Sequence, residues 1–81
     1  MGQDYNPYLK GAILEVVANQ LRDNEPPETR KTLNRLMKKG HGRKQAMEMI
    51  GSVVAIEIYE VLKAEKPFDR KRFITALNEL E

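Results

Sequence analysis

A nearly unbroken apolar run between Arg43 and Ala64 constrains the fold of this chain more than any other feature. Its apolar residues recur at helical spacing and cover most of the circumference of a helix. Only a few polar residues interrupt the run, namely Glu48, Ser52, Glu57, Glu60 and Lys63. The run is too long for a strand and contains no turn signal. A helix that is apolar nearly all round needs several neighbours, so we expect it at the centre of the domain.

Three shorter stretches carry an apolar stripe on one face only, which is typical of helices that pack around a central one. We therefore expect helices at about 7–22, 27–39, 43–64 and 70–80. The expected inward residues of the three shorter helices are Leu9, Ala12, Ile13, Val16, Val17, Gln20 and Leu21, then Leu33, Leu36 and Met37, and finally Phe73, Ile74, Leu77 and Leu80. No stretch alternates with the period of two that marks a strand. The sequence predicts an all-α fold, a small four-helix orthogonal or antiparallel bundle with a long central third helix, in which the first two helices form an antiparallel pair.

Local signals set the helix ends. Asn6 can cap the first helix, and Pro7 suits its first position because the missing N–H of proline costs nothing there. Pro27 can open the second helix for the same reason. Gly40 is a natural left-handed residue just after that helix. These signals support the predicted boundaries independently of the apolar pattern.

The last predicted helix has its own start signal. Asp69 is a good N-cap, and Phe68 and Phe73 have the spacing of a hydrophobic staple, in which a residue before the cap packs on one in the first turns.

Ser52, in the middle of the apolar run, follows Gly51. We expect these two small residues to mark a close helix crossing, with the Ser52 hydroxyl bonded to the backbone.

Length and composition place the chain in a broad class. Eighty-one residues suit one domain, 1–81, with a single core. The chain contains no cysteine, which excludes disulfides, thiolate catalysis and cysteine-based metal sites. It has no apolar stretch of the roughly 18 residues that a membrane helix needs, and no apolar leader at its start. We expect a soluble cytoplasmic protein.

The charges are distributed unevenly although the net charge is only +2. All the charged residues between positions 30 and 44 are basic, and the two flanking parts of the chain are mildly acidic. The basic residues are Arg30, Lys31, Arg35, Lys38, Lys39, Arg43 and Lys44. They surround the joint between the second and third helices, so they could form a polyanion-binding helix-turn-helix corner. Alternatively, they form an ordinary solvated face, or they balance the negative charge of the acidic ends within the chain.

Residues with catalytic potential are few. His41 is the only histidine and lies between two glycines, which hold a base or ligand poorly, so we expect it in an exposed turn. Ser52 is the only serine and lies on a different element from His41. Glu57 and Glu60 share a side of the central helix, and we expect them to belong to a solvated stripe with weak ion pairs. The sequence predicts no catalytic residue, no metal ligand and no cofactor, so we expect that the protein is not an enzyme.

Several short motifs are spread over most of the chain, up to about Lys63. They are Asn6-Pro7-Tyr8-Leu9, Asn19-Gln20-Leu21, Pro26-Pro27, Leu36-Met37, Gly40, Arg43, Ala46, Ile50-Gly51-Ser52-Val53-Val54 and Glu57-Ile58. Their order resembles a family of small bacterial all-helical domains of unknown function, whose members tend to carry paired HxxxH motifs. Such i, i+4 histidines suit a transition metal. The aligned positions in this chain are Lys10, Leu14, Ala18, Lys44 and Glu48, and only Glu48 could coordinate a metal.

These observations favour a non-enzymatic protein-interaction or self-association module, because three short helices leave part of the central helix uncovered. A homo-oligomer or a protein partner is the expected consequence, without a membrane. One alternative is a basic nucleic-acid-binding module that uses the 30–44 corner. Another is a degenerate relative of a metal-binding helical domain.

Overall fold

The computed structural model describes residues 7–81, which form four helices joined by short turns. They are α1 (Pro7–Asp23), α2 (Pro27–Lys38), α3 (Arg43–Ala64) and α4 (Arg70–Asn78). Each helix begins at the predicted residue and ends within two residues of its predicted end. Within the described range the predicted absence of strands is also confirmed. The Asn6 cap lies outside the described residues.

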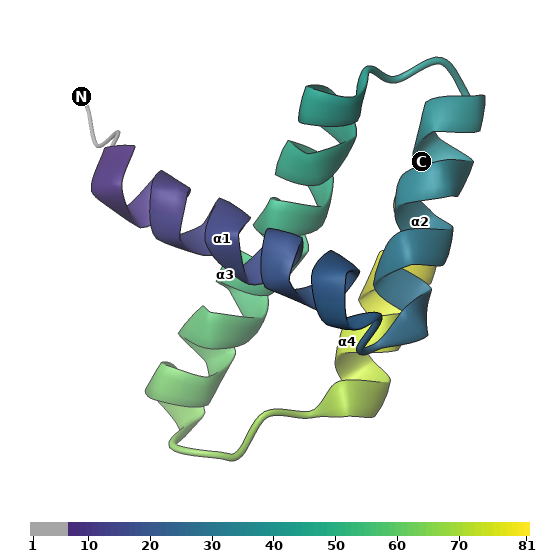
Figure 1. Cartoon of the computed structure of the whole chain (residues 1–81). Coiled ribbons are helices and arrows are strands. Elements are labelled where there is room, and N and C mark those ends of the chain that lie inside the picture. The colour runs from purple at the N-terminus through teal and green to yellow at the C-terminus, as the bar shows by residue number, and fades with distance from the viewer. Residues whose placement is uncertain (1–6) are drawn as a thin grey trace.

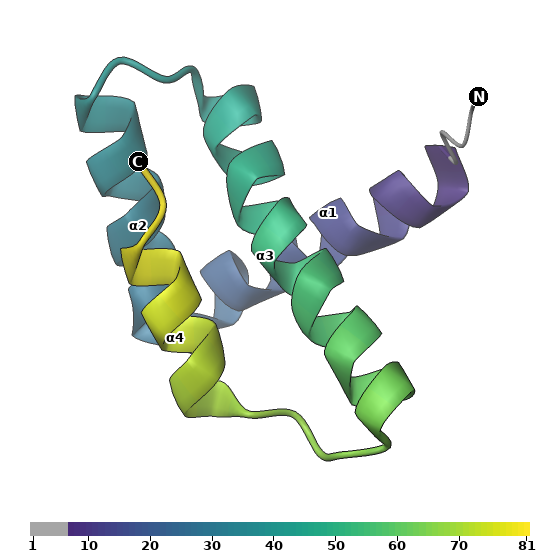
Figure 2. The same ribbon diagram turned by 180° about the vertical axis from the view of Figure 1, so that it is seen from behind.

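The long helix α3 is central, as predicted, and contacts each of the other three helices. Figures 1 and 2 show α2 and α4 running antiparallel to α3 on one side of it, while α1 lies across α3 and α2. The expected antiparallel pairing of the first two helices is therefore wrong. The apolar stripe of α1 packs across α3 as well as α2, and the turn at residues 24–26 directs the chain sideways between the first two helices.

The core gathers where the four helices meet. Its fully or nearly fully buried apolar residues are Val17, Leu21, Leu33, Leu36, Ala46, Ile50, Val53, Val54, Phe73 and Leu77. All of them belong to stripes that the sequence predicts to face inward. At the crossing of α1 and α3 the backbone of Gly51 is buried, and a Cβ atom added there would lie 3.3 Å from Cγ2 of Ile13. Gly51 therefore allows the close approach predicted for this pair of small residues.

The helix ends are built as the sequence indicates. Gly40 has φ of +105°, a conformation that other residues rarely adopt, and it follows the last turn of α2. The amide of His41 donates to the carbonyl of Leu36 at 3.2 Å, and that of Gly40 donates to the carbonyl of Met37 at 3.0 Å. This pair of bonds is the Schellman arrangement, which satisfies carbonyls at the end of α2.

The start of α4 confirms the predicted cap and staple. The backbone amide of Arg72 donates to Oδ1 of Asp69 at 3.0 Å. The rings of Phe68 and Phe73 lie 5.6 Å apart, centre to centre, in a tilted arrangement. The two aromatic side chains thus fix the direction in which the chain enters α4.

Several residues predicted to face inward are instead exposed, including Leu9, Ala12 and Met37. The first turns of α1 extend beyond α3 (Figure 1), and Leu9 and Ala12 on them remain exposed, whereas Ile13 packs against the core. None of the described helices has the combination of length and apolarity that crossing a bilayer requires.

Candidate functional site

An open apolar groove lies between α1, the C-terminal half of α3 and the start of α4. Its volume is about 350 Å³, and nearly all of its lining is apolar. The residues that line this apolar groove are Val16, Gln20, Val54, Glu57, Ile58, Val61, Leu62, Phe68 and Phe73. Such an apolar concave surface suits an apolar side chain of a partner.

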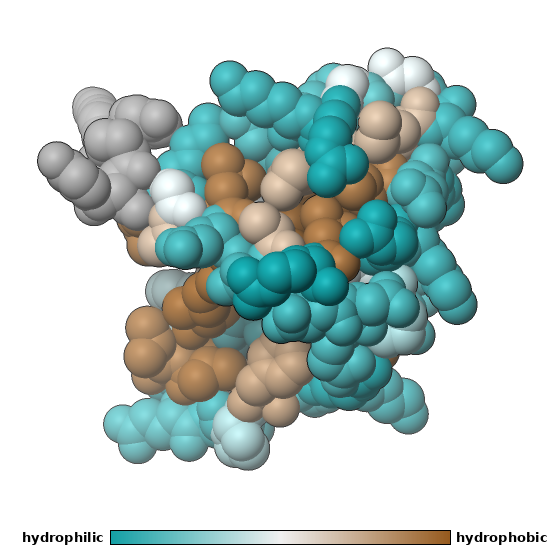
Figure 3. Space-filling model, in the orientation of Figure 1, coloured by the Kyte–Doolittle hydropathy of each residue, from teal (hydrophilic) through white to brown (hydrophobic). Residues whose placement is uncertain are grey.

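The walls of the groove consist of large apolar side chains that project into solvent. Leu62 is 73% exposed, Phe68 53% and Ile58 43%. Figure 3 shows hydrophobic surface gathered over the C-terminal half of α3, beside α1. Ile56 and Tyr59 are also exposed on this half of α3 but do not line the groove. The expectation that three short helices leave part of the central helix uncovered is therefore confirmed.

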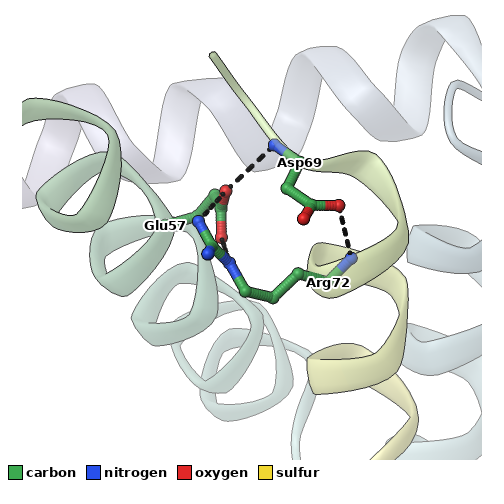
Figure 4. A network of polar contacts seen from close by, with 3 residues as sticks. All are labelled: Glu57, Asp69 and Arg72. Atoms are coloured by element: carbon green, nitrogen blue, oxygen red, sulfur yellow. Dashed lines mark hydrogen bonds and ion pairs between the residues drawn. The ribbon is translucent and has the colours of Figure 1, made fainter. Parts of the chain in front are cut away.

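A buried carboxylate stands at the edge of this groove. Glu57 is only 5% exposed, and its two oxygens accept hydrogen bonds from Arg72 of α4, at 3.0 Å from Nε and 2.9 Å from Nη2. The backbone amide of Asp69 adds a third bond, at 3.2 Å from Oε2 (Figure 4). Three donors thus satisfy the carboxylate, and together they attach α4 to α3.

This network overturns one expectation from the sequence. Glu57 was expected in a solvated stripe, yet it is buried because α4 folds back over this side of α3. The hydrogen bonds from Arg72 hold the pKa of the Glu57 carboxyl below its usual value, although burial acts in the opposite direction. Glu57 therefore remains an anion, and its hydrogen-bonded partners leave it in a structural role.

Two residues of the basic stretch also have structural roles. Arg35 donates from Nη2 to the carbonyl of Leu77 at 2.9 Å, and from Nη1 to the carbonyl of Leu80. Arg30 donates from Nη2 to the carbonyl of Leu21 at 2.7 Å. Both arginines therefore satisfy carbonyls at or near the ends of helices, where the helix dipole favours a cation. Sequence spacing could not show this, because the acceptors belong to α1 and to the end of the chain.

The other five cations of the stretch point to solvent in two groups. Lys31, Lys38 and Lys39 line one shallow depression on α2, together with Asn34, Arg35 and Met37. Arg43 and Lys44 lie at the start of α3, where they line a separate depression beside Leu14 and Met47. The structure thus divides the seven residues predicted as one corner into two arginines that bond to backbone carbonyls and two separate basic surfaces.

The two side chains considered for catalysis make local contacts. Nε2 of His41 lies 3.2 Å from the carbonyl oxygen of Glu81, in the partly exposed turn before α3. The hydroxyl of Ser52 donates to the carbonyl of Met49 at 2.6 Å, as predicted for a serine within a helix. Neither arrangement resembles a nucleophile held by a base.

Three of the positions singled out by the family resemblance lie close together in space. Nζ of Lys10 and Oε2 of Glu48 form an ion pair of 2.8 Å between α1 and α3, and Lys10 lowers the pKa of Glu48. Lys44 adds a weaker effect in the same direction. Among the described residues no group of three or more His, Cys, Asp or Glu side chains could hold a metal ion. A lysine–glutamate ion pair therefore joins the two helices at this place.

Comparison of the chain with family models, curated proteins and solved structures found no match. The resemblance to the bacterial helical family remains an expectation from the sequence motifs alone.

Proposed function

We propose that this protein is a non-enzymatic interaction module that associates with a second copy of itself through the apolar groove. The observation that carries the proposal is the exposure of Leu62, Phe68 and Ile58 around a hollow whose lining is almost wholly apolar. Soluble proteins seldom leave a large contiguous apolar surface in water, because covering it is favourable by about 25 cal/mol per Å².

The shape of this surface favours a second copy as the occupant. Leu62 projects at the rim of the groove that it helps to line. A twofold axis beside such a projection would place the Leu62 side chain of each copy against the groove of the other, so both hollows would be filled by the same contact. The wall residues Val16, Ile58 and Phe68 would then surround it as the apolar centre of the interface.

The polar groups near the groove do not oppose this association. Arg72 and the backbone amide of Asp69 already donate hydrogen bonds to the Glu57 carboxylate. Covering the groove therefore leaves no charge buried there without a partner. Gln20, which also lines the groove, accepts a hydrogen bond from the Thr29 hydroxyl at 2.8 Å. Desolvating this surface would therefore cost little.

Light scattering over a range of protein concentrations tests the proposal. The mass of one chain is 9.3 kDa, and we expect the measured mass to approach twice this value as concentration rises. Self-association should also persist at high salt, because screening weakens charge contacts and leaves apolar burial in place. A constant monomer mass up to high micromolar concentration would exclude self-association.

A further inference from the structure

The outer face of α2 carries a second surface, chemically unlike the apolar groove and independent of the function proposed for it. Lys31, Asn34 and Lys38 are exposed and follow one another at helical spacing, and Lys39 continues the row at the end of the helix. All four line the same shallow depression. We call these four residues the cationic ledge. Lys31 and Lys38 are two turns apart, or about 10 Å along the helix axis at 1.5 Å per residue.

The charges of the ledge are not neutralised by neighbours. Ion pairs in the described part of the chain join Lys10 to Glu48, Arg22 to Asp23, Arg70 to Glu25 and Arg72 to Glu57. None of these pairs involves a lysine of the ledge. Because no carboxylate pairs with Lys31, Lys38 or Lys39 in that part of the chain, the ledge retains its positive charge. This leaves at least three ammonium groups available to one partner.

We propose that the cationic ledge binds the phosphate backbone of a double-stranded nucleic acid. Interfaces with nucleic acid are polar and strongly positive, and most of their hydrogen bonds go from lysine, arginine and asparagine side chains to phosphates and sugars. The row of Lys31, Asn34 and Lys38 supplies these donors on one rigid helix. A broad, open depression also fits an extended backbone better than a small anion, which would need an enclosed site.

The surroundings favour a duplex over other polyanions. Basic helices that bind membranes place large apolar side chains next to their cations. The exposed apolar residues Ile58, Leu62 and Phe68 line the groove and not the ledge depression, so the ledge does not suit a membrane surface. Met37 is the sole apolar side chain lining that depression, so an acidic protein would find no apolar anchor of the kind that dominates protein interfaces. The lining residues include no aromatic ring on which single-stranded bases could stack.

Fluorescence anisotropy of a labelled 20-base-pair duplex, titrated with the full chain at several salt concentrations, tests the proposal. Three phosphate contacts predict a slope of about −2.7 in a plot of log affinity against log salt, or a loss of about 40-fold between 50 and 200 mM. The variant Lys31→Gln/Lys38→Gln/Lys39→Gln should lose most of the affinity and the slope. The control variant Lys63→Gln/Lys66→Gln/Lys71→Gln removes the same charge from exposed positions outside the ledge and should bind as the parent does.

Three results would overturn the proposal. The first is an absence of duplex binding by the parent protein at 50 mM salt, with circular dichroism confirming that it is folded. The second is an equal loss of affinity in the two triple variants, which would assign binding to net charge and not to the ledge. The third is binding of phosphatidylserine vesicles or polyglutamate as tight as that of the duplex at the same salt, which would assign the ledge to another class of partner.

Discussion

Arg72 of α4 donates two hydrogen bonds, of 3.0 and 2.9 Å, to the two carboxylate oxygens of Glu57 in α3. The acceptor is buried, whereas the side chain of Arg72 is 46% exposed. This bidentate contact holds the short helix α4 against α3. It thereby also positions Phe68 and Phe73, which line the apolar groove. The stability of α4 and the shape of the groove are therefore linked through one ion pair.

Replacement of Arg72 by Met should destabilise the chain because Glu57 would keep only its bond from the Asp69 amide. A buried charged acceptor that lacks donors costs about 1–3 kcal/mol or more, so we expect a clear fall in the free energy of unfolding in urea. Arg70→Met is the matched control, since Arg70 pairs with Glu25 at a largely exposed site where an ion pair contributes little. An equal effect of the two substitutions would contradict the structural role assigned to Glu57.

Acidification should lower the free energy of unfolding because Glu57 becomes protonated. Its pKa is lower in the folded chain than the ordinary value of 4.5, so the unfolded chain binds more protons at acid pH. The contribution of this carboxylate to stability is therefore complete above pH 4.5 and is lost as the pH falls through the lowered pKa.

Urea unfolding of the parent chain and of Glu57→Gln at several pH values tests this dependence. The difference in stability between the two proteins should be largest near neutral pH and should shrink as the pH falls below 4.5 and through the lowered pKa of Glu57. The pKa of Glu48 is lowered by Lys10 and Lys44, not by Glu57, so its contribution is common to both proteins and cancels in the difference. A difference that is constant with pH would show that Glu57 keeps its ordinary pKa.

Adding a side chain at Gly51 and at Gly11 should change the stability of the chain in opposite directions. Gly51→Val should destabilise the chain by about 1–3 kcal/mol, because Cβ alone would lie 3.3 Å from Ile13 and the extra methyl groups would force α1 away. Gly11→Ala should stabilise α1 by about 0.5–1 kcal/mol, because this exposed helical position has nothing within 4 Å of an added Cβ. Thermal unfolding of both variants measures the two effects, and a stabilised Gly51→Val protein would be inconsistent with a tight α1–α3 crossing.

The cap of α4 should matter separately from the ion pair. Asp69→Ala removes the acceptor of the Arg72 backbone amide and should cost about 0.5–2 kcal/mol of unfolding free energy. Asp69→Asn retains an oxygen at this place and should remain close to the parent, since asparagine is an equally good N-cap. Unfolding in urea distinguishes the two, and similar losses in both variants would indicate that the charge of Asp69 is what matters.

The sequence predicts the helices well because their signals are local. Apolar periodicity, the Gly40 turn and the Asp69 cap each involve residues only a few positions apart. The burial of Glu57 depends on a partner fifteen residues away, and the role of Arg35 depends on carbonyls more than forty residues away. No local pattern contains that information.

The candidate site shows the same limit. The apolar circumference of α3 indicates that some of it stays uncovered, but only the packing of α1 and α4 decides which side chains remain outside. Ile50 and Leu62 are both apolar residues of this helix, yet the first is fully buried and the second is 73% exposed. The run of basic residues likewise gives no hint that two arginines bond to the backbone of other helices.

Sedimentation equilibrium of the parent chain beside Leu62→Glu and Ile56→Glu tests the central claim most directly. The two positions lie on the same helix and have similar exposure, 73% and 62%, but only Leu62 lines the groove. We expect the parent and Ile56→Glu to form dimers with similar dissociation constants, and Leu62→Glu to remain monomeric although folded. A parent chain that stays monomeric, or a Leu62→Glu protein that dimerises as well as Ile56→Glu, would contradict self-association through the apolar groove.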